Sequence, residues 1–185
     1  MIASSTVREL LEAHGSCRSQ SVDEWTGSIA LPDSLARFYA EVGPVGVEVK
    51  GYGNPTYLPS LAELWDHQVG YRCDGVSGDT LDGWNPDWIV VADEGADPYI
   101  FSEDHVLFAH HGEGTWDPGE IYSDLNAMAA GIANLGSVIV DAGSDFTDDD
   151  CLVRPKYREE ALSRLRKILE SSSEAESIVV SAGWG

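Results

Sequence analysis

Two adjacent histidines followed by a glutamate form the pattern in this chain that most resembles a metal site. They are His110, His111 and Glu113, with Asp93 upstream. Imidazole nitrogens and carboxylate oxygens are ligands that zinc accepts. Adjacent residues of a strand point to opposite faces, however, and neither HExxH nor HxxxH spacing is present. We therefore expect a polar loop here, with no metal ion and no cofactor.

Other motifs that carry chemistry are incomplete. Asp148, Asp149 and Asp150, and the pair Asp79 and Asp82, resemble fragments of calcium loops, but neither fits the EF-hand pattern. The chain has no GxSxG nucleophile elbow and no glycine-rich phosphate loop. We therefore predict that the protein is not an enzyme and has no catalytic residues.

A more informative pattern is the mixture of aromatic residues and carboxylates between residues 84 and 117. Trp and Tyr are enriched at binding hot spots, and carboxylates beside them accept hydrogen bonds from a partner's Lys or Arg. The alternative is that Trp88, Tyr99 and Trp116 belong partly to the core, which is the role we favour for Trp88. The residues that we predict to bind a partner are Trp84, Asp87, Asp93, Glu94, Asp97, Asp104, Glu113, Trp116 and Asp117.

The charge of the chain is unevenly distributed. It has 11 Lys and Arg against 32 Asp and Glu, a formal net charge of −21. Between Arg72 and Arg154 there are eighteen Asp and Glu but no Lys or Arg, whereas residues 151–185 have a net charge of +1. An acidic surface aids solubility, but self-repulsion disfavours the compact state. A basic partner would gain from it through steering and complementarity.

The composition argues against several classes of partner and compartment. Binding of nucleic acid requires Lys and Arg at the phosphates, and anionic membranes repel the chain for the same reason. There is no run of about 18 apolar residues, and the N-terminus lacks the features of a signal peptide. Three widely spaced cysteines form no CxxC pair. We expect a cytoplasmic protein in a reducing compartment.

Hydrophobic periodicity predicts helices near both ends of the chain and short strands between them. The expected helices cover residues 6–13, 33–42, 61–69 and 125–139, with a last basic helix that begins at Pro155. The expected strands cover residues 45–49, 88–92, 99–101 and 106–109, and residues 178–180 form a final strand or a frayed tail. Residues 70–87 form a long surface loop. Short connectors between the middle strands predict an antiparallel meander.

These elements predict an α+β fold, in which an antiparallel sheet of about four to six strands is flanked by helices. We expect one domain over residues 1–140. Residues 141–185 would add an acidic linker and a basic helix that packs on the same domain or on a neighbouring copy. The protein is accordingly expected to be a monomer or a weak homodimer.

The order of the motifs resembles the SUKH superfamily, the fold of a yeast regulator of cell-wall synthesis that supplies many bacterial immunity proteins. The resemblance covers about residues 25–140. It begins with Leu31-Pro32, an aromatic helix with Phe38-Tyr39, and Gly43. It continues through Trp84–Asp93, Gly95–Phe101, Val106–His110, His111–Trp116 and the helix after Asp124. The chain departs from the family in having Val42 before Gly43, where Asn is common, in its long 70–87 loop, and in its basic C-terminal helix.

The resemblance implies a SUKH-like module that binds a protein and has no catalytic activity. In bacteria the partner of such a module is commonly a toxin domain, often a nuclease, delivered between competing cells. Nucleases that grip phosphates are usually basic, so the acidic composition and the family resemblance favour the same kind of partner.

Three hypotheses follow. The first is an immunity protein that neutralises a cognate toxin, and the second is a regulatory scaffold of the same fold that binds a cellular protein. The third is a metal-dependent enzyme that uses His110, His111, Glu113 and Asp93. Stoichiometric zinc or manganese in the purified protein, lost when both histidines are changed to Ala, would support the third.

Overall fold

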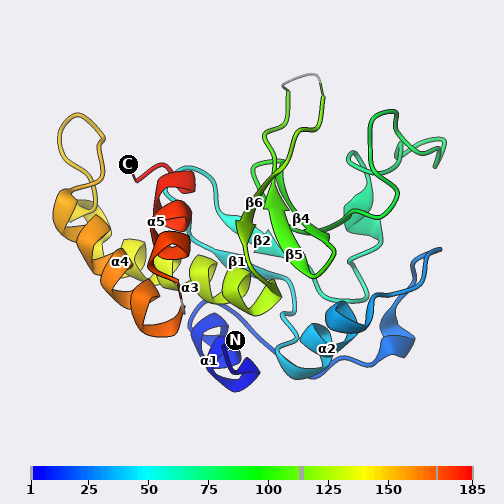
Figure 1. The fold of residues 1–185 in the computed structure, drawn as a ribbon, viewed down its shortest axis with the longest axis horizontal. Helices are drawn as coiled ribbons and strands as arrows, with labels where there is room; N and C mark the ends of the chain where they lie inside the picture. Colours follow the sequence, from blue (N-terminus) through cyan, green and yellow to red (C-terminus); the bar gives the residue numbers. More distant parts are fainter. Residues whose placement is uncertain (1, 113–114, 170, 185) are drawn as a thin grey trace.

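A six-stranded antiparallel sheet forms the centre of the computed structural model, which describes residues 2–112, 115–169 and 171–184 (Figure 1). The strands lie in the sheet in their order along the chain. They are β1 Val47–Val49, β2 Thr56–Leu58, β3 Ile89–Glu94, β4 Asp97–Ser102, β5 His105–Phe108 and β6 Gly119–Tyr122. The α+β class and the antiparallel meander are thus confirmed. Strands β2 and β6 were not predicted, and Gly119 and Glu120 give β6 no strand-like pattern.

The part of the chain that is described contains five α-helices, which lie together on one side of the sheet (Figure 1). They are α1 Ser4–Glu12, α2 Asp33–Glu41, α3 Leu125–Ala142, α4 Pro155–Ile168 and α5 Ser172–Ser181. The long helix α3 packs on one face of the sheet and also contacts α1, α2 and α4, while α5 lies against β6 and α4 (Figure 1). Three short 3-10 turns complete the structure: η1 Val22–Glu24, η2 Asp66–Gln68 and η3 Gly143–Asp145.

Helix α3 is the central helix of the core. Its N-cap is Asp124, as predicted, and the carboxylate accepts a 2.7 Å hydrogen bond from the Ala127 N–H. By length and composition alone, residues 125–145 are apolar enough to cross a membrane, but 72% of this segment is buried inside the protein. Its burial is that of a helix in the protein core.

Two glycines of α3 allow the helix to approach the sheet closely. A Cβ atom at Gly136 would lie 2.3 Å from Val49 Cγ1 on β1, and one at Gly131 would lie 2.7 Å from Tyr122 Cε1 on β6. Both separations are shorter than any carbon–carbon contact that packing tolerates. The distance between α3 and the sheet is therefore set by the absence of side chains at these two positions.

Two predictions about secondary structure were wrong. Residues 61–69 form turns and η2 rather than an α-helix, although the Ser60 N–H donates a 3.1 Å hydrogen bond to the Glu63 carboxylate, as at a helix N-terminus. The buried Gln68 side chain exchanges two 2.9 Å hydrogen bonds with the backbone of Val90, which ties this segment to β3 in a non-helical path. Residues 178–180 lie in α5, where Ile178 and Val179 enter the core.

The basic residues around α4 bond mainly to carboxylates of the C-terminal part of the chain. Most of their partners lie between residues 145 and 176, and one, Asp141, lies in the last turn of α3. The pairs are Arg154 and Lys156 with Asp145, Arg158 and Arg166 with Glu176, and Arg164 with Asp141 and Glu160. These Lys and Arg residues thus form ion pairs at the helical end of the molecule and do not pair with the carboxylates of the sheet.

We predict that Gly136→Ala destabilises the protein by about 1–3 kcal/mol, because the added methyl group must push α3 away from Val49. The higher helix propensity of Ala offsets only about 1 kcal/mol of this strain. Val140→Ala is the matched control, since Val140 lies on the same helix and is 56% exposed. Urea unfolding followed by circular dichroism measures both, and a Gly136→Ala protein as stable as the wild type would contradict this packing.

Candidate functional site

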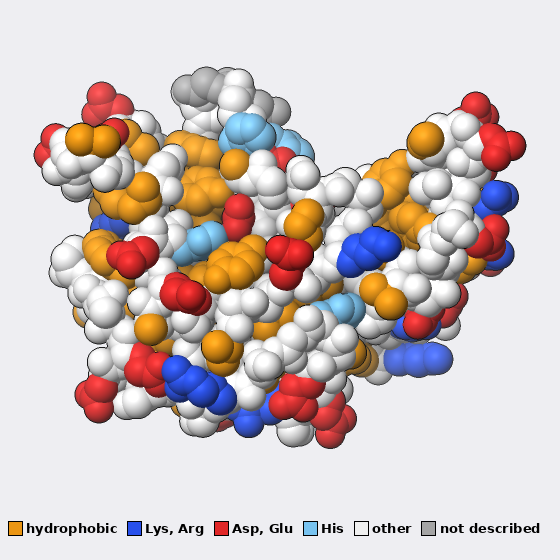
Figure 2. Space-filling model, turned by 180° about the vertical axis from the view of Figure 1, so that it is seen from behind, with side chains coloured by type: hydrophobic (Ala, Val, Ile, Leu, Met, Phe, Trp, Pro, Cys, Tyr) orange, Lys and Arg blue, Asp and Glu red, His pale blue; other side chains and the backbone are white. Residues whose placement is uncertain are grey.

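The face of the sheet opposite α3 is covered by aromatic side chains from the 70–88 segment. Val90, Ile100 and Ala109 are buried beneath them. Tyr71, Trp84, Trp88 and Trp116 pack here with ring centroids 5.3–6.2 Å apart. With nearby polar groups they form a surface that we call the aromatic–acidic face: Tyr57, His67, Tyr71, Trp84, Trp88, Asp93, Asp97, His110, His111 and Trp116. Figure 2 shows hydrophobic, acidic and histidine side chains beside one another on a face hollowed between projecting loops.

A β-bulge determines which carboxylates of β3 reach this face. The register of β3 against β4 shifts between Val90 and Ala92. Val90 belongs to the outer cluster, whereas Val91 and Ala92 both belong to the main core. The extra residue reverses the alternation, so that Asp93 faces outward. Glu94, the next residue, faces the helices.

Asp93 is held by contacts from two elements. Its Oδ1 lies 3.2 Å from His67 Nε2, and its Oδ2 accepts hydrogen bonds from the Tyr71 hydroxyl at 3.5 Å and the Ala96 N–H at 3.4 Å. Burial by itself would raise the pKa of the Asp93 carboxyl, but the histidine, amide and hydroxyl contacts outweigh it and hold the pKa below the ordinary value. Asp93 is therefore a carboxylate at neutral pH.

Asp97 binds both adjacent histidines. Its Oδ1 accepts from the His111 N–H at 2.8 Å and lies 2.6 Å from His111 Nδ1, and its Oδ2 lies 3.2 Å from His110 Nδ1. Burial opposes ionisation here too, but the bonds from His111 and His110 lower the pKa of Asp97 overall. The expectation that the two imidazoles point apart was wrong, because residue 111 lies in a turn after β5 rather than in the strand.

Glu94 is in a different environment although it is adjacent to Asp93. Its Oε2 accepts a 3.5 Å hydrogen bond from the buried Tyr99 hydroxyl, and the side chain lines a small cavity between the sheet and α3. Burial raises the pKa of Glu94, and this effect exceeds the lowering that comes from Tyr99. Two successive carboxylates of β3 thus have pKa values shifted in opposite directions.

Asp87 and Asp104 lie at the opposite end of β3 and β4 from Asp93 and Asp97. Together they line a groove of about 430 Å³ whose apolar wall includes Ile89 and Phe101. Four of the predicted carboxylates therefore separate into two acidic areas, with Asp93 and Asp97 at one end of this pair of strands and Asp87 and Asp104 at the other. The sequence placed them within one stretch of the chain but did not indicate this separation.

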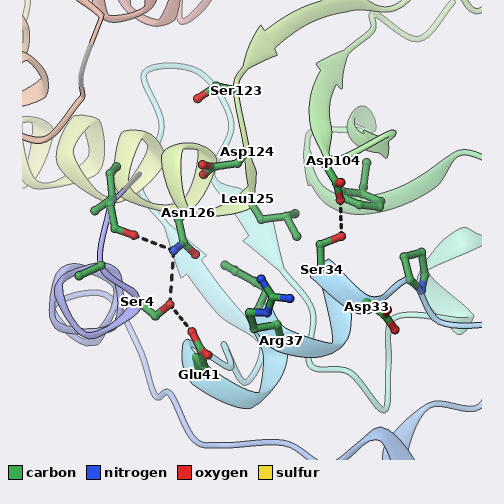
Figure 3. A pocket seen from close by; sticks show the side chains of 15 residues that line it. Ser4, Asp33, Ser34, Arg37, Glu41, Asp104, Ser123, Asp124, Leu125 and Asn126 are labelled. Atoms are coloured by element: carbon green, nitrogen blue, oxygen red, sulfur yellow. Dashed lines mark hydrogen bonds between the residues drawn. The ribbon is translucent and has the colours of Figure 1, made fainter.

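A second groove adjoins this one and is shown in Figure 3. We call it the α2–α3 groove. It has a volume of about 760 Å³ and lies between α2, the N-termini of α1 and α3, and the β4–β5 turn. Carboxylates from three of these elements surround it, and a guanidinium from α2 lies among them: Asp33, Glu41, Asp104, Asp124 and Arg37.

The remaining predicted residues have different surroundings. Trp84 is only 5% exposed and forms the centre of the aromatic cluster, so it supports the face rather than covering it. Trp116 and Trp88 are half-buried, and Asp117 is exposed. Glu113 lies outside the described residues. Of the predicted set, the structure brings together Trp84, Asp93, Asp97 and Trp116.

The histidines do not converge on one carboxylate set that would suit a metal. Asp93 pairs with His67, whereas Asp97 pairs with His110 and His111. In the described ranges no three His, Cys, Asp or Glu residues are arranged to hold a metal ion. Asp93 and Asp97 are thus each held beside histidine at partly exposed positions.

Sequence reasoning missed Tyr57, His67, Tyr71 and Arg37. The first three come from β2 and from the turn before the long loop, and reach the face only through the pairing of β2 with β3 and the Gln68 bonds to Val90. Arg37 had a detectable signal, since it lies four residues from both Asp33 and Glu41 on a predicted helix.

Comparison of the chain with models of protein families, with curated proteins and with solved structures finds no match. The proposals on function below are therefore supported by the geometry and charge of the two acidic areas and by the motif order of the sequence.

The opposite pKa shifts of Asp93 and Glu94 predict opposite effects of neutralising them. The pKa of Glu94 is raised because burial favours the protonated side chain over the charged one. The stabilisation from the protonated side chain is therefore complete below about pH 4.5 and is lost as pH rises through the pKa of Glu94 in the folded protein. Glu94→Gln should therefore stabilise the protein at pH 7, by less than about 1 kcal/mol because the group remains partly solvated, and have no effect below pH 4.

Asp93 has a lowered pKa, so its contribution is present above about pH 3.8 and disappears as pH falls through the folded-state value. Asp93→Asn should destabilise the protein at pH 7, and the difference should shrink as pH falls below about 4. Thermal unfolding of both variants from pH 3 to pH 7 checks the pair. Changes of the same sign at pH 7 would contradict the assignment of the two side chains to different environments.

Proposed function

We propose that this protein is an immunity protein without catalytic activity, which binds and neutralises a cognate bacterial toxin through its acidic surface. The observation that carries the proposal is the distribution of ion pairs. In residues 2–112, 115–169 and 171–184, only the Arg18–Glu24 pair joins a Lys or Arg to a carboxylate outside the C-terminal part. Asp93, Asp97 and Glu120 of the sheet each lie within 4 Å of a histidine nitrogen and form no ion pair with a Lys or Arg of the described residues.

The chain's own cations are not arranged to neutralise this surface. Arg72, the last basic residue before the long acidic stretch, instead donates to the backbone carbonyls of Pro86 and Trp88 at 2.7 and 3.2 Å and lies over the ring of Trp65. Its charge thus fastens the covering loop. A surface of uncompensated carboxylates accelerates and orients the approach of a positively charged partner.

The partner that fits this surface is a basic protein domain. Aromatic rings beside carboxylates suit Arg and Lys side chains, which combine a cation with an apolar stem. A nuclease-type toxin presents such residues where it grips phosphates. The SUKH-like order of motifs supports the same kind of partner, and the aromatic–acidic face is the contact that we assign to it.

The proposed site of action is the bacterial cytoplasm, where a nuclease toxin would act. Cys17, Cys73 and Cys151 are free thiols, as expected in a reducing compartment.

The test is co-expression with the protein encoded by the adjacent gene. If that protein stops growth when expressed alone, we expect this chain to restore growth and to co-purify with it as a one-to-one complex. A toxic neighbour that is neither rescued nor bound contradicts the proposal. Capture of a cellular protein without any toxic neighbour would favour the regulatory scaffold instead.

Charge variants locate the contact once a complex is obtained. Asp93→Asn with Asp97→Asn should weaken the complex by at least about tenfold, because it removes two carboxylates from the aromatic–acidic face. Asp149→Asn with Asp150→Asn is the matched control, since it removes the same charge from an exposed loop before α4. Equal weakening by both doubles would show that net charge, rather than this face, determines binding.

A further inference from the structure

The α2–α3 groove combines an apolar floor with an acidic rim. Phe38, Phe101 and Leu125 line it, although each side chain is only 4–5% exposed. With a volume of about 760 Å³, the groove is large enough to admit several side chains of another protein. It lies apart from the aromatic–acidic face, at the other end of the sheet.

The carboxylates of the rim retain free acceptor positions. Glu41 accepts one hydrogen bond from the Ser4 hydroxyl at 2.6 Å, and Asp104 accepts one from the Ser34 hydroxyl at 2.5 Å. Both bonds are drawn in Figure 3. An ionised carboxylate offers about four acceptor positions. The serines therefore orient these groups over the groove without saturating them.

Among the described residues, Arg37 is the one basic residue that lines the groove. It is exposed, and among the described residues it forms no ion pair within 4 Å, although Asp33 and Glu41 lie one turn before and after it on α2. Four carboxylates against one guanidinium leave the groove negative. An anionic ligand would be repelled by this rim, and a cationic one would be attracted.

We infer that the α2–α3 groove accepts an Arg or Lys side chain of the protein partner, as a second contact beside the aromatic–acidic face. The alkyl part of the inserted side chain packs on Phe38, Phe101 and Leu125, and its cation binds the rim carboxylates around Asp104. Arg37 opposes this insertion and so limits its strength. The identity of the partner in this inference rests on the proposed function. The chemistry of the groove does not depend on that function.

The test is a titration of the full-length, 15N-labelled protein with the peptide acetyl-Leu-Arg-Leu-amide, followed by NMR. The same peptide with citrulline, which is the uncharged counterpart of Arg, is the ligand control. We expect the Arg peptide to shift the amide signals of Phe38, Phe101, Leu125 and Asn126, and the citrulline peptide to shift them far less. Shifts confined to other residues, or equal responses to both peptides, would overturn the inference.

Two single variants test the sign of the charge effect. Asp104→Asn should weaken binding of the Arg peptide by about two- to fivefold, and Arg37→Gln should strengthen it by a similar factor. Asn tolerates the positive φ of 69° at position 104, so this variant keeps the turn. Asp149→Asn is the control for loss of one charge and should have no effect. Weaker binding after Arg37→Gln would show that Arg37 supports binding of the cationic peptide instead of opposing it, and would overturn the inference.

The inference and the proposed function can fail separately. If the groove binds the Arg peptide but no toxin is neutralised, the inference holds and the proposed function falls. If the toxin is neutralised but its affinity is unchanged in Asp104→Asn and Arg37→Gln, the proposed function holds and the inference falls.

Discussion

The packing of α3 on the sheet is the constraint on which the rest of the structure depends. This helix has no charged residue before Asp141 and has thirteen buried residues. Burial of that apolar surface is the main stabilising contribution at the centre of the molecule. Gly131 and Gly136 bring the helix close to β6 and β1, and α1, α2 and α4 pack around it.

Because α3 covers one face of the sheet, the other face needs a different cover. The 70–88 segment provides it through Tyr71, Trp84 and Trp88, and is fastened by Arg72 and by the Gln68 side chain. A loop anchored by aromatic side chains leaves polar groups at its edges exposed to solvent. A second layer of helices would bury those groups. The β-bulge in β3 then directs Asp93 into this edge beside the histidines. The acidic face is thus a consequence of how the outer surface of the sheet is covered.

The separation of charge has a related origin. The cations around α4 bond to carboxylates at residues 141, 145, 160 and 176, which stabilise the packing of the C-terminal helices. Exposed pairs of this kind contribute little individually. Because these cations are paired near the C-terminus, the described carboxylates of the sheet have no Lys or Arg partners. The carboxylates repel one another, and binding of a basic protein would relieve this repulsion.

Much of the fold was predictable from local patterns. The Asp124 cap followed by helical spacing predicted α3, and the short acidic connectors predicted the meander, since both signals arise from neighbouring residues. The path of residues 61–69 was not predictable, because it depends on the Gln68 bonds to Val90 on a distant strand. For the site, local sequence indicated only that Asp93 and Asp97 belong to one stretch of partner-binding residues. The approach of His67 and the separation of Asp104 depend on the bulge and on strand direction, which a residue pattern does not reveal.

The most direct test of the central claim, that an acidic surface captures a basic protein, is the rate of association with the purified toxin domain at increasing ionic strength. We predict that the association rate constant falls steeply, by about tenfold or more between 20 and 500 mM NaCl, while the dissociation rate constant changes much less. A rate of association independent of salt would contradict it, because the uncompensated carboxylates would then have no part in recognition.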